Sequence, residues 1–282
     1  MASDLTYYEK EVLTCPCCQK QFRREQLRKG GGRLTMKEVR LDFHQIYTPT
    51  EKYGDVYPLL YSVLVCPQCY YASYKTEFGK LKDSEKSAIA AKEPERKELV
   101  DLLFSGLDFI NPRRLQEGVS SYLLAISTYS CLGLDKSPTI RMGISALRAG
   151  WLMEDLHAKF PADNWDYLAQ LLYRKAGFFY RRAIEMEAAM KERVSETPGL
   201  GPDFEQRFGF DGVLYLYAYL EYHYGPDNDP KVRFAQMEKA KQYVGRIFGM
   251  GRHSKEKPQM LLDRAHDLYD EISKWCKQHG GE

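Results

Sequence analysis

The sequence predicts an α+β fold that is mainly α, in which a small β module precedes an antiparallel helical bundle. Two observations carry this prediction. Two C-x2-C cysteine pairs, Cys15-Pro16-Cys17-Cys18 and Cys66-Pro67-Gln68-Cys69, both lie in the first quarter of the chain. Beyond about residue 82, apolar residues recur at helical spacing between proline and glycine clusters. We therefore predict two domains, over residues 1–82 and 83–282.

Composition is that of an ordinary globular protein. Charged residues make up 28% and apolar residues 44% of the 282, and a net charge of +2 singles out no partner. The N-terminal residues lack the apolar core of a signal peptide, and no run approaches the ~20 apolar residues of a membrane helix. We expect no membrane insertion and a cytoplasmic location. Seven cysteines in a reducing compartment favour metal binding or free thiols over disulfides.

The paired cysteines predict one structural zinc site with the ligands Cys15, Cys18, Cys66 and Cys69. Each short turn can aim two sulfurs at one point, and four thiolates match the tetrahedral preference of Zn²⁺. Four thiolates also leave no open position for a water molecule, which argues against hydrolytic chemistry. A module of ~80 residues has a thin core that a structural metal would reinforce, as in a zinc ribbon.

Other interpretations of these thiols stay open. Cys17 lies between two of the proposed ligands, and either Cys17 or His44 is a possible substitute ligand. The first pair also resembles a thioredoxin-type dithiol, which would make the protein a C-x-x-C thiol redox protein. That fold places its dithiol in a βαβ unit, and no such pattern surrounds this pair.

The 47 residues between Cys18 and Cys66 are too many for a compact ribbon and must have structure of their own. Residues 33–43, 57–65 and 70–74 read as strands, and Gly30-Gly31-Gly32 as a turn. From Lys20 to Arg40, eight lysines and arginines stand against two glutamates. This basic insert, residues 20–40, is a solvated hairpin, a surface for the chain's own acidic helices, or a nucleic-acid contact. Its candidate phosphate-binding residues are Arg23, Arg24, Arg28 and Lys29.

A series of motifs follows the chain from the cysteine pairs to the helical half. It consists of both cysteine pairs with Phe22, Tyr47, Tyr71-Ala72 and Phe78, the stretches Arg40–Phe43 and Tyr57–Tyr61, and Ala146–Leu152. This series resembles an uncharacterised bacterial family, domain of unknown function 2225. The resemblance covers most of the chain and implies a paired-cysteine module followed by tetratricopeptide-like helices, with no activity assigned. In this sequence Gln19 and Tyr70 stand where a glycine would normally follow the second cysteine of each turn.

The second half predicts six main helices. Asn111-Pro112, Ser137-Pro138 and Asp229-Pro230 each place a capping residue before a proline, which is a helix start signal. Alanines recur on the predicted helix faces, which favours close antiparallel pairs of the tetratricopeptide type. Lys80–Glu98 reads as an exposed helix or a linker. The predicted helices cover residues 112–131, 138–158, 164–193, 209–224, 230–248 and 258–278, with 96–108 as a further candidate.

No nucleophile–base pair, phosphate loop or dinucleotide fingerprint emerges from the sequence, so we expect a protein that is not an enzyme. The first hypothesis is a zinc-stabilised adaptor whose helices bind a protein partner of unknown identity. Stacked helix pairs form concave faces, and tyrosine and arginine are enriched at interface hot spots. The expected partner-binding residues are Arg174, Arg181, Tyr215, Tyr219 and Tyr222. A nucleic-acid-binding protein and a thiol redox protein remain the alternatives.

Overall fold

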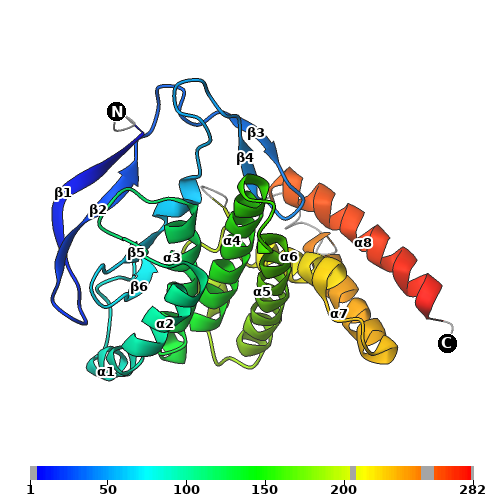
Figure 1. Cartoon of the computed structure of the whole chain (residues 1–282). Helices are drawn as coiled ribbons and strands as arrows, with labels where there is room; N and C mark the ends of the chain where they lie inside the picture. The colour runs from blue at the N-terminus through cyan, green and yellow to red at the C-terminus, as the bar shows by residue number, and fades with distance from the viewer. Residues whose placement is uncertain (1–4, 204–207, 249–256, 281–282) are drawn as a thin grey trace. The chain divides into compact units, whose positions relative to one another are not determined.

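The computed structural model describes residues 5–203, 208–248 and 257–280. These residues form eight α-helices and three two-stranded antiparallel hairpins, and all the hairpins lie in the N-terminal part of the chain (Figure 1). The predicted mainly α composition, with a few strands at the N-terminus, is confirmed. None of the described helices combines the length and apolarity needed to cross a membrane.

The chain divides into two compact units, which we describe separately. The first comprises residues 1–133 and 145–169, and the second residues 134–144 and 170–282. The predicted boundary between residues 82 and 83 lies inside the first unit. This unit contains all three hairpins, so strands and helices share its core.

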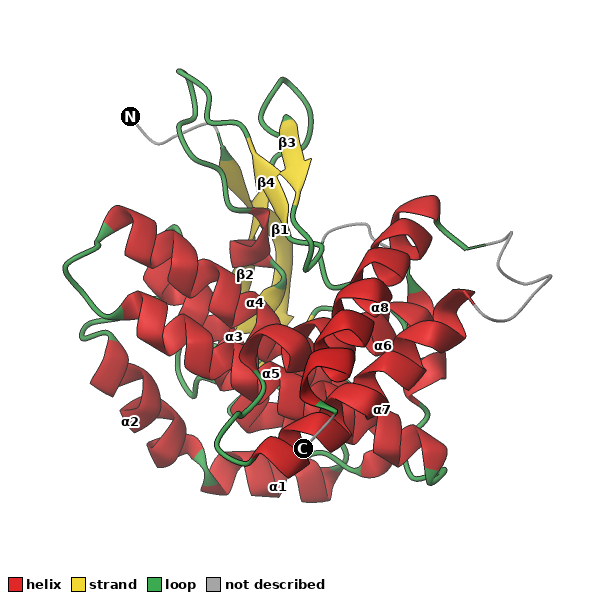
Figure 2. Ribbon diagram, turned by 90° about the vertical axis from the view of Figure 1, so that its right-hand side faces the viewer, coloured by secondary structure: helices red, strands yellow, loops and turns green. Residues whose placement is uncertain are grey.

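The three hairpins differ greatly in length. Strand β1 (Thr6–Thr14) pairs with β2 (Gln21–Leu27), with an irregularity between Tyr8 and Val12. Strand β3 (Met36–Val39) pairs with β4 (Gln45–Tyr47), and β5 (Val63–Val65) with β6 (Ala72–Tyr74). Figure 2 draws the strands in yellow and labels β1 to β4.

Two strands predicted from the sequence were too long. Residues 33–43 shorten to β3 because the chain turns after it, where Phe43 takes a left-handed φ of 68°. Residues 57–65 begin with a 3₁₀ helix over Pro58–Tyr61, and the strand β5 follows it. Proline is favoured in the first turn of a helix, and a fully buried apolar run has no period that separates helix from strand.

The stretch Lys80–Glu98, expected as an exposed helix or a linker, is helical and mostly exposed, but one side of it is buried. It forms helix α1 (Asp83–Ala91) and most of α2 (Glu93–Leu103), in which Ile89 and Arg96 are buried. Helix α3 (Leu115–Tyr129) packs against both β5 and β6. Thr128 Oγ1 accepts a hydrogen bond from the backbone N–H of Ala72, and Tyr129 Oη from that of Tyr74, at 3.4 and 3.2 Å. The short third hairpin is therefore fixed to a buried helix.

The remaining helices lie close to the predicted ranges. They are α4 (Pro138–Lys159), α5 (Trp165–Ala188), α6 (Gly209–Tyr224), α7 (Pro230–Phe248) and α8 (Gln259–His279), and the division between the units falls within α4 and α5. Helix α5 ends five residues before the predicted limit of 193, because Met190 adopts a left-handed φ of 53°. A left-handed residue just past the last turn is a common helix stop.

The second unit is built from closely packed helices. Helix α6 is buried on all its faces from Gly212 to Glu221, and α6, α7 and α8 pack against one another. Gly143 and Gly177 stand where helices approach most closely. An added Cβ would lie 3.0 Å from the Tyr180 ring at Gly143 and 3.4 Å from Leu220 at Gly177.

Candidate metal centre

The first cysteine pair lies at the tip of the long hairpin. Thr14 and Gln21 form the last pair of the β1–β2 ladder, and residues 15–20 make the turn between them. Within the turn, the backbone N–H of Gln19 donates to Cys15 O at 3.0 Å, and the N–H of Cys15 donates to Lys20 O at 2.9 Å. These two bonds wrap the backbone around the side chains of Cys15 and Cys18.

The second cysteine pair repeats this geometry at the tip of the short hairpin, after the final β5–β6 pair Val65–Ala72. The N–H of Tyr70 donates to Cys66 O at 3.0 Å, and the N–H of Cys66 donates to Tyr71 O at 2.9 Å. We call residues 15–20 the first knuckle and residues 66–71 the second knuckle. Two segments that are far apart in the sequence thus form the same turn.

Each knuckle needs one residue in the left-handed region of backbone conformation. Gln19 has a φ of 62° and Tyr70 a φ of 55°, at equivalent positions. Left-handed backbone costs a non-glycine residue about 1–2 kcal/mol, which explains why glycine would be the ordinary choice there. The chain keeps the turn without glycine, so other interactions must offset this strain.

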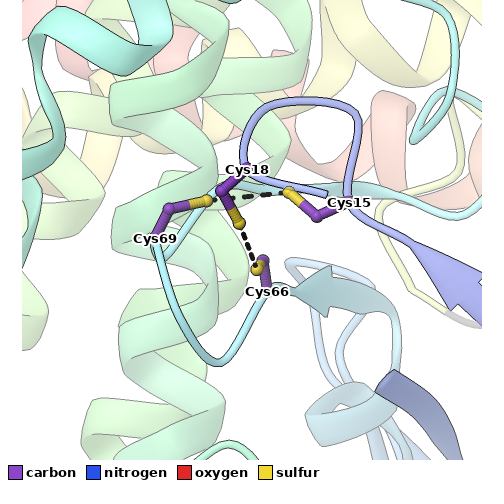
Figure 3. A group of neighbouring side chains, drawn as sticks. All are labelled: Cys15, Cys18, Cys66 and Cys69. Atoms are coloured by element: carbon purple, nitrogen blue, oxygen red, sulfur yellow. Dashed lines mark hydrogen bonds between the residues drawn. The ribbon is translucent and has the colours of Figure 1, made fainter. Parts of the chain in front are cut away.

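The four predicted cysteines come together (Figure 3). The Sγ atoms of Cys15 and Cys69 lie 3.6 Å apart, and those of Cys18 and Cys66 lie 3.5 Å apart. All four sulfurs lie within 4.8 Å of one another, and none is in a disulfide. Zn–S bonds of about 2.3 Å would place the sulfurs of a tetrahedral site about 3.8 Å apart. The cluster therefore has the donor set and the size for a tetrahedral thiolate-bound metal ion.

The electrostatics of the cluster favour a cation at its centre. Hydrogen bonds from Cys17, then from Cys66 and Cys69, lower the pKa of Cys15 and stabilise its thiolate. The bond with Cys15 raises the pKa of Cys66, to about 12, and also raises that of Cys69. Without a cation, one thiolate suppresses ionisation of its neighbours. A divalent ion removes this conflict, because it binds all four as thiolates.

Neither alternative ligand belongs to the group. Among the described residues, the sulfurs that converge are those of Cys15, Cys18, Cys66 and Cys69. His44 stacks on Trp151 instead, with ring centroids 4.5 Å apart. Its burial, and then the nearby charge of Arg40, lower its pKa to about 3, so this imidazole is neutral.

The cluster is part of a small hydrophobic core. Cys15, Cys66 and Cys69 are buried together with Leu64, Tyr71, Phe78 and Ile89. Cys17 and Cys18 are partly buried at its edge. This core contains residues from the tips of the β1–β2 and β5–β6 hairpins and from helix α1. It therefore joins segments that are far apart in the sequence.

The basic insert is only partly available for a nucleic acid. Arg23, Arg28 and Lys29 are exposed. Arg24 is largely buried, lies 3.6 Å from Glu9, and donates to Tyr61 O at 3.4 Å. Arg24 therefore supports the fold, and contact between the other three residues and nucleic acid stays a prediction.

The expected partner-binding residues also separate into two sets. Tyr215 and Tyr219 are 1% and 9% exposed, so their rings fill the core and offer no surface to a partner. Tyr222 is partly exposed. Arg174 and Arg181 both line a cavity of about 260 Å³ beside the end of helix α6. The two arginines and Tyr222 are therefore the accessible part of this prediction, and partner binding by them stays a prediction.

Sequence reasoning missed two buried polar arrangements in the first unit. Asp42, only 1% exposed, accepts hydrogen bonds from Trp151 Nε1 at 2.7 Å and from Arg40 at 2.9 Å. The family resemblance had singled out Arg40–Phe43 and Ala146–Leu152, which contain these residues, but it did not indicate that Asp42 and Trp151 are in contact. Arg96 donates to Cys69 O at 3.1 Å from helix α2. It stands in a run of charged residues that reads as solvated, so the sequence carries no signal for its burial.

Comparisons with known proteins agree with this arrangement of motifs. A curated protein of Borreliella burgdorferi (strain ATCC 35210 / DSM 4680 / CIP 102532 / B31), described as "Uncharacterized protein", is 38% identical over 273 residues. The match covers 97% of this chain and 98% of that protein. No solved structure matches the chain. The profile of a family described as "Uncharacterized protein conserved in bacteria (DUF2225)" matches residues 7–272. The chain therefore belongs to this bacterial family.

Proposed function

We propose that this protein is a non-enzymatic adaptor, in which a structural zinc ion shapes the first unit and the helical second unit binds a protein partner. The observation that carries the proposal is the convergence of four sulfurs within 4.8 Å from two knuckles of the same geometry. Paired knuckles at hairpin tips are what a zinc ribbon requires. We expect one Zn²⁺ per chain.

The donor set supports a structural role for the metal. Four thiolates from the chain complete a tetrahedral shell, whereas a catalytic zinc keeps one position for water. Cys15, Cys66 and Cys69 are almost fully buried, which also keeps substrates away from the ion. The bound metal fixes the shape of the hairpin tips and takes no part in a reaction.

The helical unit supports the binding role. Glycine and alanine at the helix contacts, such as Gly143, Gly177 and Ala176, allow the close packing typical of tetratricopeptide-like pairs. The cavity of about 260 Å³ is lined by Arg174, Arg181 and Phe178, and the Phe178 side chain is 52% exposed. A cavity that joins an aromatic face to two guanidinium groups suits a segment with both acidic and apolar side chains.

The charge balance of the cavity favours an acidic partner. The one acidic residue that lines it, Glu221, is buried and lies 3.3 Å from Arg233. Arg233 forms the ion pair with this carboxylate, and Arg181 interacts with it less strongly, so the charge of Arg174 and part of that of Arg181 remain for a ligand. Arg181 also lies over the Phe178 ring, 5.8 Å from its centroid, which holds the guanidinium beside the aromatic face.

The test uses charge reversal on helix α5. We expect the parent protein to enrich acidic sequences from a fluorescent peptide library of aspartate, glutamate and apolar residues. The double variant Arg174→Glu/Arg181→Glu should lose this enrichment. The matched control Lys175→Glu/Arg182→Glu, which changes the charge equally on exposed positions outside the cavity, should keep it. No enrichment by the parent, or equal loss in the control, would contradict the proposal.

A further inference from the structure

Helix α2 carries a buried cation that has no carboxylate partner within the described part of the chain. Arg96 is 1% exposed. Its two terminal nitrogens donate to backbone carbonyls, those of Ile89 and Cys69, and its buried Nε has no hydrogen-bond partner among the described residues. Carbonyl groups satisfy N–H donors but do not neutralise a charge. A buried guanidinium without a counter-charge is strongly destabilising, so a charge from elsewhere is required.

Two other cations that interact with the cysteines have carboxylate partners. Lys97 interacts electrostatically with Cys69, and its Nζ lies 2.7 Å from Glu93. Lys86 interacts with Cys17, and its Nζ lies 2.8 Å from Asp83. The side chains of both lysines are partly exposed to solvent, at 38% and 41%, which reduces the effect of their charges. Arg96 is the buried exception, and its electrostatic interaction with Cys17 places its charge close to the cluster.

A metal-loaded cluster would carry the missing charge. Four thiolates around one divalent cation leave an excess of two negative charges in formal terms. Burial of that excess in the core of Leu64, Tyr71 and Ile89 is unfavourable unless a cation lies nearby. The negative charge of the loaded cluster therefore compensates the positive charge of the Arg96 guanidinium, and the guanidinium compensates the cluster in turn.

We propose that Arg96 is the counter-charge of the metal-loaded cysteine cluster, and that it positions the second knuckle through its hydrogen bond to Cys69 O. This inference rests on the proposed zinc site. Arg96 is a positioning residue, because it acts on the metal through a ligand's backbone and through its charge. Metal binding and the burial of Arg96 are consequently coupled: loss of the metal leaves the guanidinium uncompensated, and loss of the guanidinium weakens the metal site.

The first experiment measures zinc affinity by competition with a chromophoric chelator. Arg96→Gln keeps an N–H donor but removes the charge, and we expect its affinity to fall 10- to 100-fold, as is typical when an outer partner of a metal site is lost. Arg96→Lys keeps the charge and should lie between the parent and Arg96→Gln. The control Lys97→Gln removes an exposed charge from the next position and should stay close to the parent.

The second experiment separates the charge from a purely structural role. Thermal unfolding is measured for the parent and Arg96→Gln, each with zinc and after removal of zinc. A structural role alone would lower both melting temperatures equally. The counter-charge role lowers that of the loaded protein more, because the metal-free protein is relieved of an uncompensated charge. The stabilisation gained on zinc loading should therefore shrink in Arg96→Gln.

Several outcomes overturn the inference. They are an unchanged zinc affinity in Arg96→Gln, an affinity of Arg96→Lys no higher than that of Arg96→Gln, and equal destabilisation with and without zinc. If Arg96→Gln folds only with zinc present, the rate of zinc transfer to excess chelator is measured in place of the zinc affinity. A transfer rate no higher than that of the parent then also overturns the inference. A parent that holds no zinc refutes the zinc site itself. A parent that holds zinc beside unaffected variants refutes only the role of Arg96.

Discussion

The two knuckles have the same backbone hydrogen bonds but very different surroundings. The second knuckle ends a hairpin whose strands β5 and β6 are buried throughout and joined to helix α3 through Thr128 and Tyr129. The first ends a hairpin in which much of β1 is exposed. It is joined to the rest of the unit by polar bonds, such as that from the Arg113 N–H to Glu25 at 2.9 Å, and by a few apolar contacts, such as that of Phe22 with Phe78.

This difference assigns unequal roles to the two halves of the site. The second knuckle is held by packing before any metal arrives. The first depends more on the sulfurs at its tip, because apart from the buried Cys15 its apolar residues, such as Leu13 and Phe22, lie only partly buried at the edge of the core. Because one pair of ligands is already ordered, metal binding has to order only the second pair. The conformational entropy cost of binding is therefore lower than if all four ligands had to be ordered at once.

Removal of zinc should have the largest effect and should be uneven. After extraction with a chelator, we expect the amides of Cys15 and Gln19 to lose most of their protection from hydrogen exchange. The equivalent amides of Cys66 and Tyr70 should keep more, since α3 supports their hairpin. Exchange monitored by NMR or mass spectrometry checks this. Equal loss in the two knuckles would refute the asymmetry.

A ligand substitution should come next in size. Cys66→Ser removes one thiolate, and we expect zinc content to fall from about one to near zero per chain, with the helices of the second unit retained. The control Cys17→Ser changes a thiol outside the converging group and should keep its zinc. Elemental analysis and circular dichroism provide the measurements. Equal zinc in Cys66→Ser and the parent would remove the metal assignment.

The support from helix α3 can be weakened without a change at the cysteines. Tyr129→Phe deletes the hydroxyl that accepts from Tyr74 N and donates to Glu77, so both hydrogen bonds of this buried group are lost. We expect a loss of about 1–3 kcal/mol in the free energy of unfolding, measured with denaturant. Tyr7→Phe removes an exposed hydrogen bond of the first hairpin, to Gln26, and should change stability far less. Similar losses would show that the two hairpins are equally supported.

The left-handed residues provide the smallest test. Gln19→Gly relieves backbone strain at an exposed position, and we expect a gain of up to about 1 kcal/mol in stability. Tyr70→Gly relieves the same strain but loses the packing of the Tyr70 ring on Phe109, whose centroids are 5.3 Å apart. Its stability should therefore change less favourably. Thermal melts of the zinc-loaded proteins rank the two, and the reverse order would contradict the assigned contacts.

The sequence was most informative where chemistry depends on fixed spacing. C-x2-C pairs are recognisable whatever surrounds them, so the convergence of four cysteines could be predicted, and proline and glycine signals placed most of the helices. The first hairpin could not be predicted, because burial along Thr6–Thr14 shows no alternation for a period-two pattern to reveal. Arg96 could not be found either. Its role depends on tertiary packing that brings α2 beside Cys69.

The position of the two cysteine pairs has a consequence for synthesis of the protein. Neither knuckle alone offers more than two converging ligands, so a complete site exists only after Cys69 has been made. About fifty residues separate Cys18 from Cys69. At ordinary elongation rates the first pair of thiols waits for roughly 3–10 s on the ribosome. During this interval the nascent chain carries the unprotected thiols of Cys15, Cys17 and Cys18, which makes early synthesis the moment of greatest exposure to oxidants and to competing soft metal ions.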